Sequence, residues 1–223
     1  VRMSLSTGCR SEPTMDVFSG ERAFQHVRTQ VALGPRPPGS EAARKLRAWL
    51  RGQLEPLGFR VEEQAFEART PRGRIRMVNV IARRPGTKPR SLVLGAHADT
   101  KLFDDFHFVG ANDGASGVAA LVELARVLSA RPLGHGLTLA FFDGEEALVE
   151  WGPDDGLYGS THLVDSWVDS GEARRVAAVF VLDMVGDKDL RITDELNSHP
   201  ELRSLLRSEA ERLGYGSVFA GPI

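Results

Sequence analysis

Short apolar segments that alternate with amphipathic segments constrain the fold of this chain most strongly. Residues 91–96, 137–142 and 176–182 are apolar runs with the length of β-strands. Helical spacing of apolar residues marks 115–130, and a further helix is predicted at 158–168. Strands that are apolar on both faces need helices on both sides of the sheet. The sequence therefore predicts an α/β fold with a mixed, mainly parallel central sheet sandwiched by helices.

The N-terminal part of the chain adds two helices and a hairpin to this pattern. Residues 20–33 show helical spacing, and Ser40 is a suitable N-cap for a second helix. Two strands are predicted near 59–67 and 74–83, joined by a tight turn, and this hairpin is the reason to expect a mixed sheet. A last amphipathic helix is predicted at 199–213.

The domain organisation is simple, because neither a repeat nor a long linker interrupts the chain. We expect a single domain over residues 20–223, preceded by a disordered leader or signal remnant at 1–19. The segment Leu5-Ser6-Thr7-Gly8-Cys9 resembles the end of a bacterial lipoprotein signal. The segment is compatible with a periplasmic, lipid-anchored or secreted protein and equally with a chance free thiol near a floppy terminus, so the localisation stays open.

Composition excludes several classes of partner. The chain is 42% hydrophobic and 26% charged, with a net charge of −2. This balance does not suit nucleic acid or an anionic membrane as the main partner. No apolar run approaches the roughly 18 residues of a membrane-spanning helix. We expect a monomer with no transmembrane segment.

Acidic and imidazole side chains follow each of the three apolar strands directly. They are His97 and Asp99 after the first strand, Asp143, Glu145 and Glu146 after the second, and Asp183 after the third; Asp113 precedes the helix at 115–130. Ligands of open α/β sheets bind beyond the carboxyl ends of the strands. We therefore expect these groups to converge on one crevice.

A cluster of carboxylates with a histidine predicts a bound metal ion. Such carboxylates repel one another unless a divalent cation neutralises them. Imidazole and carboxylate ligands favour zinc, although other first-row metals remain open. Glu145 and Glu146 are adjacent and point different ways, so one can bind metal while the other moves protons. Asp99 is placed to orient the ring of His97 from behind.

The motifs that carry these residues resemble the zinc aminopeptidase (M28) clan. The matching segments are His97-Ala98-Asp99, residues 110–118, residues 143–146 and Leu182-Asp183. Within this clan, the flanking residues are similar to animal-type glutaminyl cyclases and their bacterial homologues. These are residues 36–40, 97–101, 108–111, 141–147, Trp151 and 157–160.

The resemblance implies a role for each site residue. Asp113 and Glu146 would bind one zinc ion, and Glu145 would shuttle the proton. Asp183 would hydrogen-bond Glu145 or the substrate amine, and Trp151 would form a wall of the substrate pocket. The implied reaction converts N-terminal glutamine of peptides to pyroglutamate and releases ammonia.

A zinc site needs a third protein ligand. The family supplies a histidine from a later loop, which we expect beyond Ile223. We therefore expect that the natural zinc-hydrolase-like domain has a C-terminal part that this sequence lacks.

Two other functions stay open. In a two-zinc aminopeptidase that hydrolyses the N-terminal peptide bond, His97 and Asp183 would bind a second zinc, Asp113 would bridge both ions and Glu145 would activate a water. In a peptidase-like binding domain, the site would be catalytically inactive. Both enzymes would act on peptide or protein N-termini, and the surroundings of Trp151 and Lys101 favour the cyclase.

Overall fold

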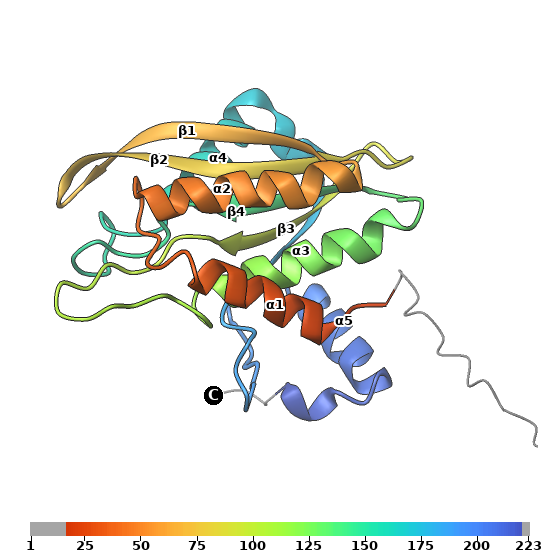
Figure 1. Cartoon of the computed structure of the whole chain (residues 1–223). Coiled ribbons are helices and arrows are strands. Elements are labelled where there is room, and N and C mark those ends of the chain that lie inside the picture. Colours follow the sequence, from red (N-terminus) through yellow and green to blue (C-terminus); the bar gives the residue numbers. More distant parts are fainter. Residues whose placement is uncertain (1–16, 220–223) are drawn as a thin grey trace, which may run out of the picture. The chain divides into compact units, whose positions relative to one another are not determined.

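The computed structural model describes residues 17–219, and these divide into two compact units (Figure 1). The first unit ends at Met184 and the second begins at Val185. The single domain expected from residue 20 onward stays a prediction. Cys9 and most of the expected leader lie outside the described residues.

Two N-terminal helices begin at serine N-caps. Helix α1 spans Gly20–Val31 and α2 spans Glu41–Leu54, followed by the short 3₁₀ helix η1 at Glu55–Leu57. Ser40 Oγ accepts a hydrogen bond from the backbone N–H of Ala43 at 3.1 Å, which satisfies one of the free donors at the start of α2. The capping prediction for Ser40 is confirmed.

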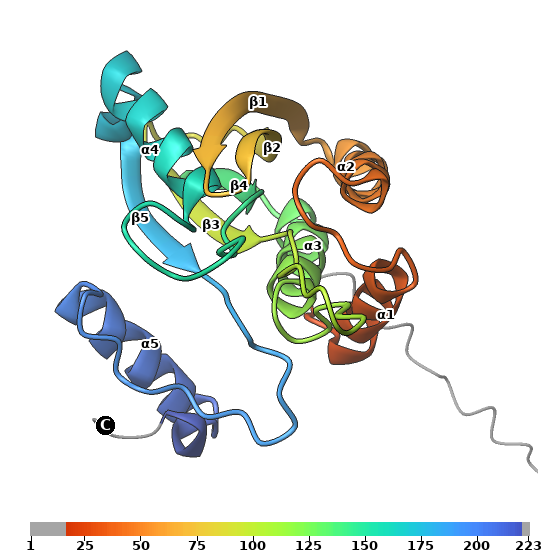
Figure 2. The same cartoon turned by 90° about the vertical axis from the view of Figure 1, so that its left-hand side faces the viewer.

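One five-stranded mixed sheet forms the centre of the first unit (Figure 2). Its strands are β1 Arg60–Thr70, β2 Gly73–Arg84, β3 Ser91–His97, β4 Gly136–Phe142 and β5 Val176–Val181, in the order β1-β2-β4-β3-β5. The pairs β1–β2 and β2–β4 are antiparallel, and the pairs β3–β4 and β3–β5 are parallel. The predicted mixed α/β fold is confirmed, and the hairpin supplies the antiparallel part.

Helices cover both faces of this sheet, as the apolar strands predict (Figure 2). On one face, α2 and α3, which spans Ala115–Ser129, pack against the sheet in a core that includes Leu139. On the other face, α4, which spans Tyr158–Ser170, packs against Phe142. Side chains of β4 alternate between these two cores, and every residue of β4 is buried.

Strand β5 differs from the expectation of burial on both faces. Its residues alternate between partial burial and exposure, and Val179 and Val181 are exposed. The strand lies at the edge of the sheet beyond β3, so it has one neighbouring strand. Among the described residues, β5 is therefore less buried than its apolar composition predicts.

The remaining helices are η2 Glu172–Arg175 in the first unit and α5 Pro200–Arg212 and η3 Gly216–Val218 in the second. Within the second unit, an ion pair joins Arg207 to Asp194 at 2.9 Å. The helix predicted at 199–213 is confirmed as α5. None of the helices described here has the length and apolar character of a membrane span.

A fully buried arginine ties the loop after α1 to the loops around the strand ends. Arg36 donates hydrogen bonds to the carbonyl oxygens of Val109 and Gly110 at 2.9 and 3.3 Å, and further bonds to those of Gln30, Gly34 and Ala98. Burial lowers the pKa of Arg36 to about 10, so it remains charged at neutral pH. Its partners are backbone carbonyls that no shorter side chain would satisfy together.

We expect Arg36→Met to lower the free energy of unfolding by about 3–5 kcal/mol, because several buried carbonyls lose their donor at once. Arg44→Met makes the same change at an exposed position of α2 and should alter stability by less than about 0.5 kcal/mol. Urea unfolding of both variants measures the difference. Equal stability of the two variants would contradict the structural role of Arg36.

Candidate active site

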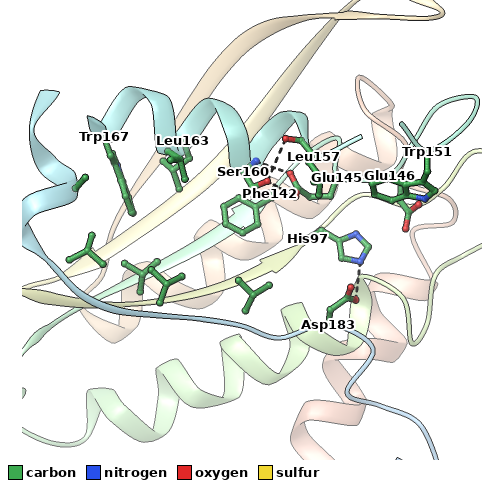
Figure 3. Close-up of a pocket in the computed structure, with 16 residues that line it drawn as sticks. His97, Phe142, Glu145, Glu146, Trp151, Leu157, Ser160, Leu163, Trp167 and Asp183 are labelled. Atoms are coloured by element: carbon green, nitrogen blue, oxygen red, sulfur yellow. Dashed lines mark hydrogen bonds and ion pairs between the residues drawn. The ribbon is translucent and has the colours of Figure 1, made fainter. Parts of the chain in front are cut away.

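The predicted site residues converge at one edge of the sheet. Strands β3, β4 and β5 run parallel to one another, so their carboxyl ends meet there. His97 is the last residue of β3, and Asp183 follows β5 closely. Figure 3 shows Glu145 and Glu146, from the loop after β4, on the same side of the sheet as His97. The topology brings together residues that lie far apart in the sequence.

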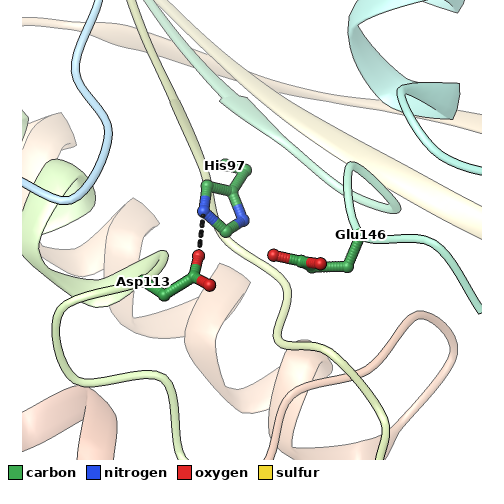
Figure 4. Close-up of side chains that lie close together, drawn as sticks. All are labelled: His97, Asp113 and Glu146. Atoms are coloured by element: carbon green, nitrogen blue, oxygen red, sulfur yellow. Dashed lines mark ion pairs between the residues drawn. The ribbon is translucent and has the colours of Figure 1, made fainter. Parts of the chain in front are cut away.

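His97, Asp113 and Glu146 form a group of possible metal ligands (Figure 4). Each offers one ligand atom, and these atoms lie within 4.8 Å of one another. His97 Nε2 lies 2.9 Å from Asp113 Oδ1 and 3.3 Å from Asp183 Oδ1. The resemblance gives His97 a supporting or second-metal position. The structure places its ring nitrogen directly beside the predicted ligand Asp113.

A glycine allows Asp113 to come this close to the end of β3. Gly114 has φ of +87°, a left-handed conformation that side chains disfavour. A Cβ at this position would lie 2.8 Å from the carbonyl oxygen of Asp99 and 3.3 Å from His97 Cε1. The loop before α3 can therefore approach β3 only because residue 114 has no side chain.

Asp99 holds the backbone of the glutamate pair. Its carboxylate is buried and accepts hydrogen bonds from the N–H groups of Glu145 at 3.2 Å and Glu146 at 3.1 Å. The nearest approach to His97 Nδ1 is 3.5 Å, and that nitrogen has no well-formed hydrogen bond. Asp99 thus lies near His97, but its hydrogen bonds go to the loop that carries Glu145 and Glu146, and its role in orienting the His97 ring stays a prediction.

Glu145 is held by a residue to which the sequence assigns no role. Both of its carboxylate oxygens accept hydrogen bonds from Ser160, one from the N–H and one from Oγ, each at 2.7 Å. Burial raises the pKa of Glu145, although these bonds oppose the shift. One sequence feature could have indicated this contact: Ser160 lies in the first turn of the helix predicted at 158–168, where free backbone N–H groups attract a carboxylate.

The electrostatics of the cluster suit a divalent cation. Burial and the charges of Asp113 and Asp99 raise the pKa of Glu146 to about 7. Burial opposes a charge on His97, but hydrogen bonds to Asp113 and Asp183 and the nearby negative charge of Asp99 outweigh it and raise the pKa to about 12. These shifts mark a site of concentrated negative charge that a proton or a metal ion can neutralise. The residues present therefore fit a metal with nitrogen and oxygen ligands.

An apolar pocket of about 570 Å³ opens beside the cluster (Figure 3). His97, Glu145, Glu146 and Asp183 line it together with many apolar side chains. These include Phe142, Trp151, Leu157, Leu163, Val164 and Trp167. The pocket thus combines a few convergent polar groups with an apolar wall, the usual composition of a small-ligand site.

Lys101 and Asp143 both lie near the glutamate pair, but they contact different parts of the protein. Lys101 Nζ donates a hydrogen bond to the carbonyl oxygen of Ala147 at 2.6 Å, directly after the glutamate pair. Asp143 instead turns into the protein and accepts a hydrogen bond from the N–H of Val78 at 2.8 Å. Of the acidic residues that follow β4, Asp143 is structural, whereas Glu145 and Glu146 reach the pocket.

We expect Ser160→Ala to lower kcat/KM by about 10- to 100-fold, the effect of losing one hydrogen bond to a charged group. The metal content should not change, because Ser160 contacts Glu145 and not the cluster of His97, Asp113 and Glu146. Ser170→Ala removes a hydroxyl from the other end of α4 and serves as the control. Steady-state kinetics that do not distinguish the two variants would contradict this role.

Comparison with known proteins gives the family. The sequence pattern of peptidase family M28 matches residues 79–218, and the chain belongs to this family. The chain is 36% identical to an Acidobacteriales bacterium glutaminyl cyclase of known structure, with a TM-score of 0.88, over 99% of this chain and 76% of that one. A Zn-dependent exopeptidase from Parabacteroides distasonis is 28% identical, with a TM-score of 0.79, over 92% of this chain and 77% of that one.

A curated relative agrees with the structural neighbours. The glutaminyl-peptide cyclotransferase of Drosophila melanogaster is 35% identical over 187 residues, which is 80% of this chain and 53% of that protein. The chain thus spans about half the length of this relative. The resemblance to glutaminyl cyclases within the M28 clan, first indicated by the motifs, is confirmed.

Proposed function

We propose that the protein is a zinc-dependent glutaminyl-peptide cyclotransferase. The observation that carries the proposal is the placement of Glu145. Its half-buried carboxylate, held by Ser160, lines an apolar pocket beside His97, Asp113 and Glu146. Similarity to glutaminyl cyclases supports the same reaction.

Each residue of the site has a task in this reaction. The α-amine of the peptide attacks the carbonyl carbon of its own glutamine side chain, a new C–N bond closes the ring, and the side-chain nitrogen leaves as ammonia. Glu145 takes a proton from the attacking amine and delivers one to the leaving nitrogen. Asp183 lines the pocket and can accept a hydrogen bond from the amine before it attacks.

Zinc held by Asp113 and Glu146 would polarise the amide carbonyl. His97 lies beside both Asp113 and Asp183 and links the metal-binding side of the pocket to the amine-binding side. Trp151 would form part of the wall against which the glutamine side chain packs. Burial raises the pKa of Glu145, which makes its carboxylate a better proton acceptor than an exposed glutamate.

The second candidate is a two-zinc aminopeptidase. The observation in its favour is the contact of His97 Nε2 with both Asp113 and Asp183, the residues that would share a second ion. Similarity to a Zn-dependent exopeptidase agrees with it. In that reaction Glu145 would activate a water molecule and the first residue of the peptide would be released.

One assay separates the two reactions. The zinc-loaded full chain is incubated with a peptide that begins with glutamine, with its N-acetylated counterpart, and with an aminoacyl chromogen. Ammonia release from the free peptide, with no reaction of the acetylated one, supports the cyclase. Release of a free amino acid or of the chromogen overturns it in favour of the peptidase. If neither product forms, both enzymatic functions are overturned and the function of a binding domain is left.

The metal content provides a second measurement. About one zinc per chain fits the cyclase, and about two fit the peptidase.

A further inference from the structure

Asp155 is a buried carboxylate in the loop between β4 and α4, and it is only 4% exposed. It accepts hydrogen bonds from the backbone N–H groups of Leu148, Val149 and Glu150 at 2.9, 2.8 and 3.0 Å. The hydroxyl of Tyr158 donates a fourth bond at 3.0 Å. Three successive backbone donors that point at one carboxylate define the conformation of the segment just before Trp151.

The backbone of Asp155 holds the other side of Trp151. Asp155 pairs with Gly152 as an isolated antiparallel bridge, and its N–H donates to the carbonyl oxygen of Gly152 at 3.2 Å. Trp151 therefore lies between two segments, residues 148–150 and Gly152, that are both bound to the same residue. The side chain of Asp155 fixes the first segment, and its backbone fixes the second.

The indole of Trp151 packs against the residue that follows Asp155. Gly156 has φ of +112°, and a Cβ there would lie 2.5 Å from Cζ3 of the Trp151 ring. Only glycine leaves room for the ring to lie against the backbone at this point. The indole is nevertheless 55% exposed, so its other side faces the pocket and solvent.

The backbone carbonyl groups just before Trp151 also form hydrogen bonds with side chains. Lys101 Nζ binds the carbonyl oxygen of Ala147 at 2.6 Å, and Arg72 Nε binds that of Leu148 at 3.0 Å. The N–H groups of residues 148–150 thus bind Asp155, while the carbonyl groups of Ala147 and Leu148 bind the side chains of Lys101 and Arg72. Burial opposes ionisation of Asp155, but its four hydrogen bonds outweigh it and lower the pKa.

We propose that Asp155 is the positioning residue of the pocket, which holds the exposed Trp151 indole as a preformed wall against the substrate. This inference rests on the proposed function, in which Trp151 contacts the glutamine side chain. Asp155 itself does not line the pocket beside the metal cluster. It acts through the backbone on both sides of Trp151.

The test uses Asp155→Asn, which keeps the shape but replaces an acceptor oxygen by a donor. Asp154→Asn is the matched control, because the same change is made one residue away at an exposed side chain. Both variants are made in the zinc-loaded full chain with 5-fluorotryptophan at its three tryptophans. The ¹⁹F resonance of residue 151 is assigned by its loss in Trp151→Phe.

We expect Asp155→Asn to shift and broaden the residue 151 resonance, while those of Trp49 and Trp167 and the zinc content stay unchanged. For cyclisation, KM should rise and kcat should change less, because a wall that binds substrate and transition state alike is lost. The fall in kcat/KM is expected at about 10- to 100-fold. Asp154→Asn should match the unmodified chain in both readouts.

An unmoved residue 151 resonance and unchanged KM in Asp155→Asn would overturn the proposal. If this variant does not fold, Tyr158→Phe decides, since it removes the fourth donor to Asp155 and otherwise only the contact of the same hydroxyl with the carbonyl oxygen of Asp154. A shift confined to residue 151 supports the proposal, and an unchanged spectrum overturns it. If the unmodified chain does not cyclise glutamine, the proposed function fails. The ¹⁹F comparison still decides whether Asp155 holds Trp151.

Discussion

Glu145→Gln is expected to lower kcat by about 10²- to 10⁴-fold, the usual contribution of a general acid–base. The amide has the same shape as the carboxylate and can still accept a hydrogen bond from Ser160, but it cannot take up the proton of the attacking amine. Zinc should stay bound, because Glu145 is outside the group of His97, Asp113 and Glu146. Steady-state kinetics and metal analysis of the same sample provide the two readouts.

Glu150→Gln is the control for this change. Glu150 is an exposed glutamate on the same loop, and its replacement should leave both kcat and zinc content near their original values. Loss of zinc from Glu145→Gln would show that the roles of the two adjacent glutamates are reversed. Full activity of Glu145→Gln would show that another group moves the proton.

Asp113→Asn is expected to weaken zinc binding by at least about 100-fold, since even residues behind the ligands change metal affinity by about 10- to 100-fold. A neutral amide is a poor replacement for a carboxylate at a cation, and of the two proposed zinc ligands among the described residues only Glu146 would remain charged. Competition with a chromogenic chelator measures the affinity.

Asp105→Asn offers a matched comparison, because Asp105 is an exposed carboxylate in the loop that leads to Asp113. Its zinc affinity should equal that of the unmodified chain. A folded Asp113→Asn variant that retains tight zinc binding would be inconsistent with Asp113 as a ligand and would move the metal site elsewhere.

Two adjacent glutamates can take different roles because their backbone is held in one conformation. Asp99 accepts the N–H groups of both residues, and this fixes the turn from which their side chains diverge. One side chain, Glu145, then reaches Ser160 at the start of α4. The other, Glu146, reaches His97 and Asp113. The proposed division between proton transfer by Glu145 and metal binding by Glu146 thus has a basis in local backbone geometry.

The sequence by itself determined the class of fold and the edge of the sheet where the site lies. Apolar periodicity reports burial locally, so the strands ending at His97 and Phe142 and the helix from Ala115 could be located without a structure. Parallel strands share one carboxyl edge, so polar residues just beyond them had to meet. Strand β5 was less predictable, because exposure depends on what covers an edge strand and not on its own composition.

Only the tertiary structure decided what each polar side chain contacts. Asp99, Asp143 and Asp155 are all buried aspartates near the site, yet they bind the glutamate loop, β2 and the Trp151 loop respectively. The local sequence around each aspartate does not reveal its partner, because a carboxylate accepts hydrogen bonds from whichever donors the packing brings within about 3 Å. The hydrogen-bond partners of Arg36 and Ser160 likewise follow from tertiary packing and not from the local sequence. Local patterns therefore specify the elements and the edge they share, whereas hydrogen-bond partners far apart in the chain emerge only when those elements pack.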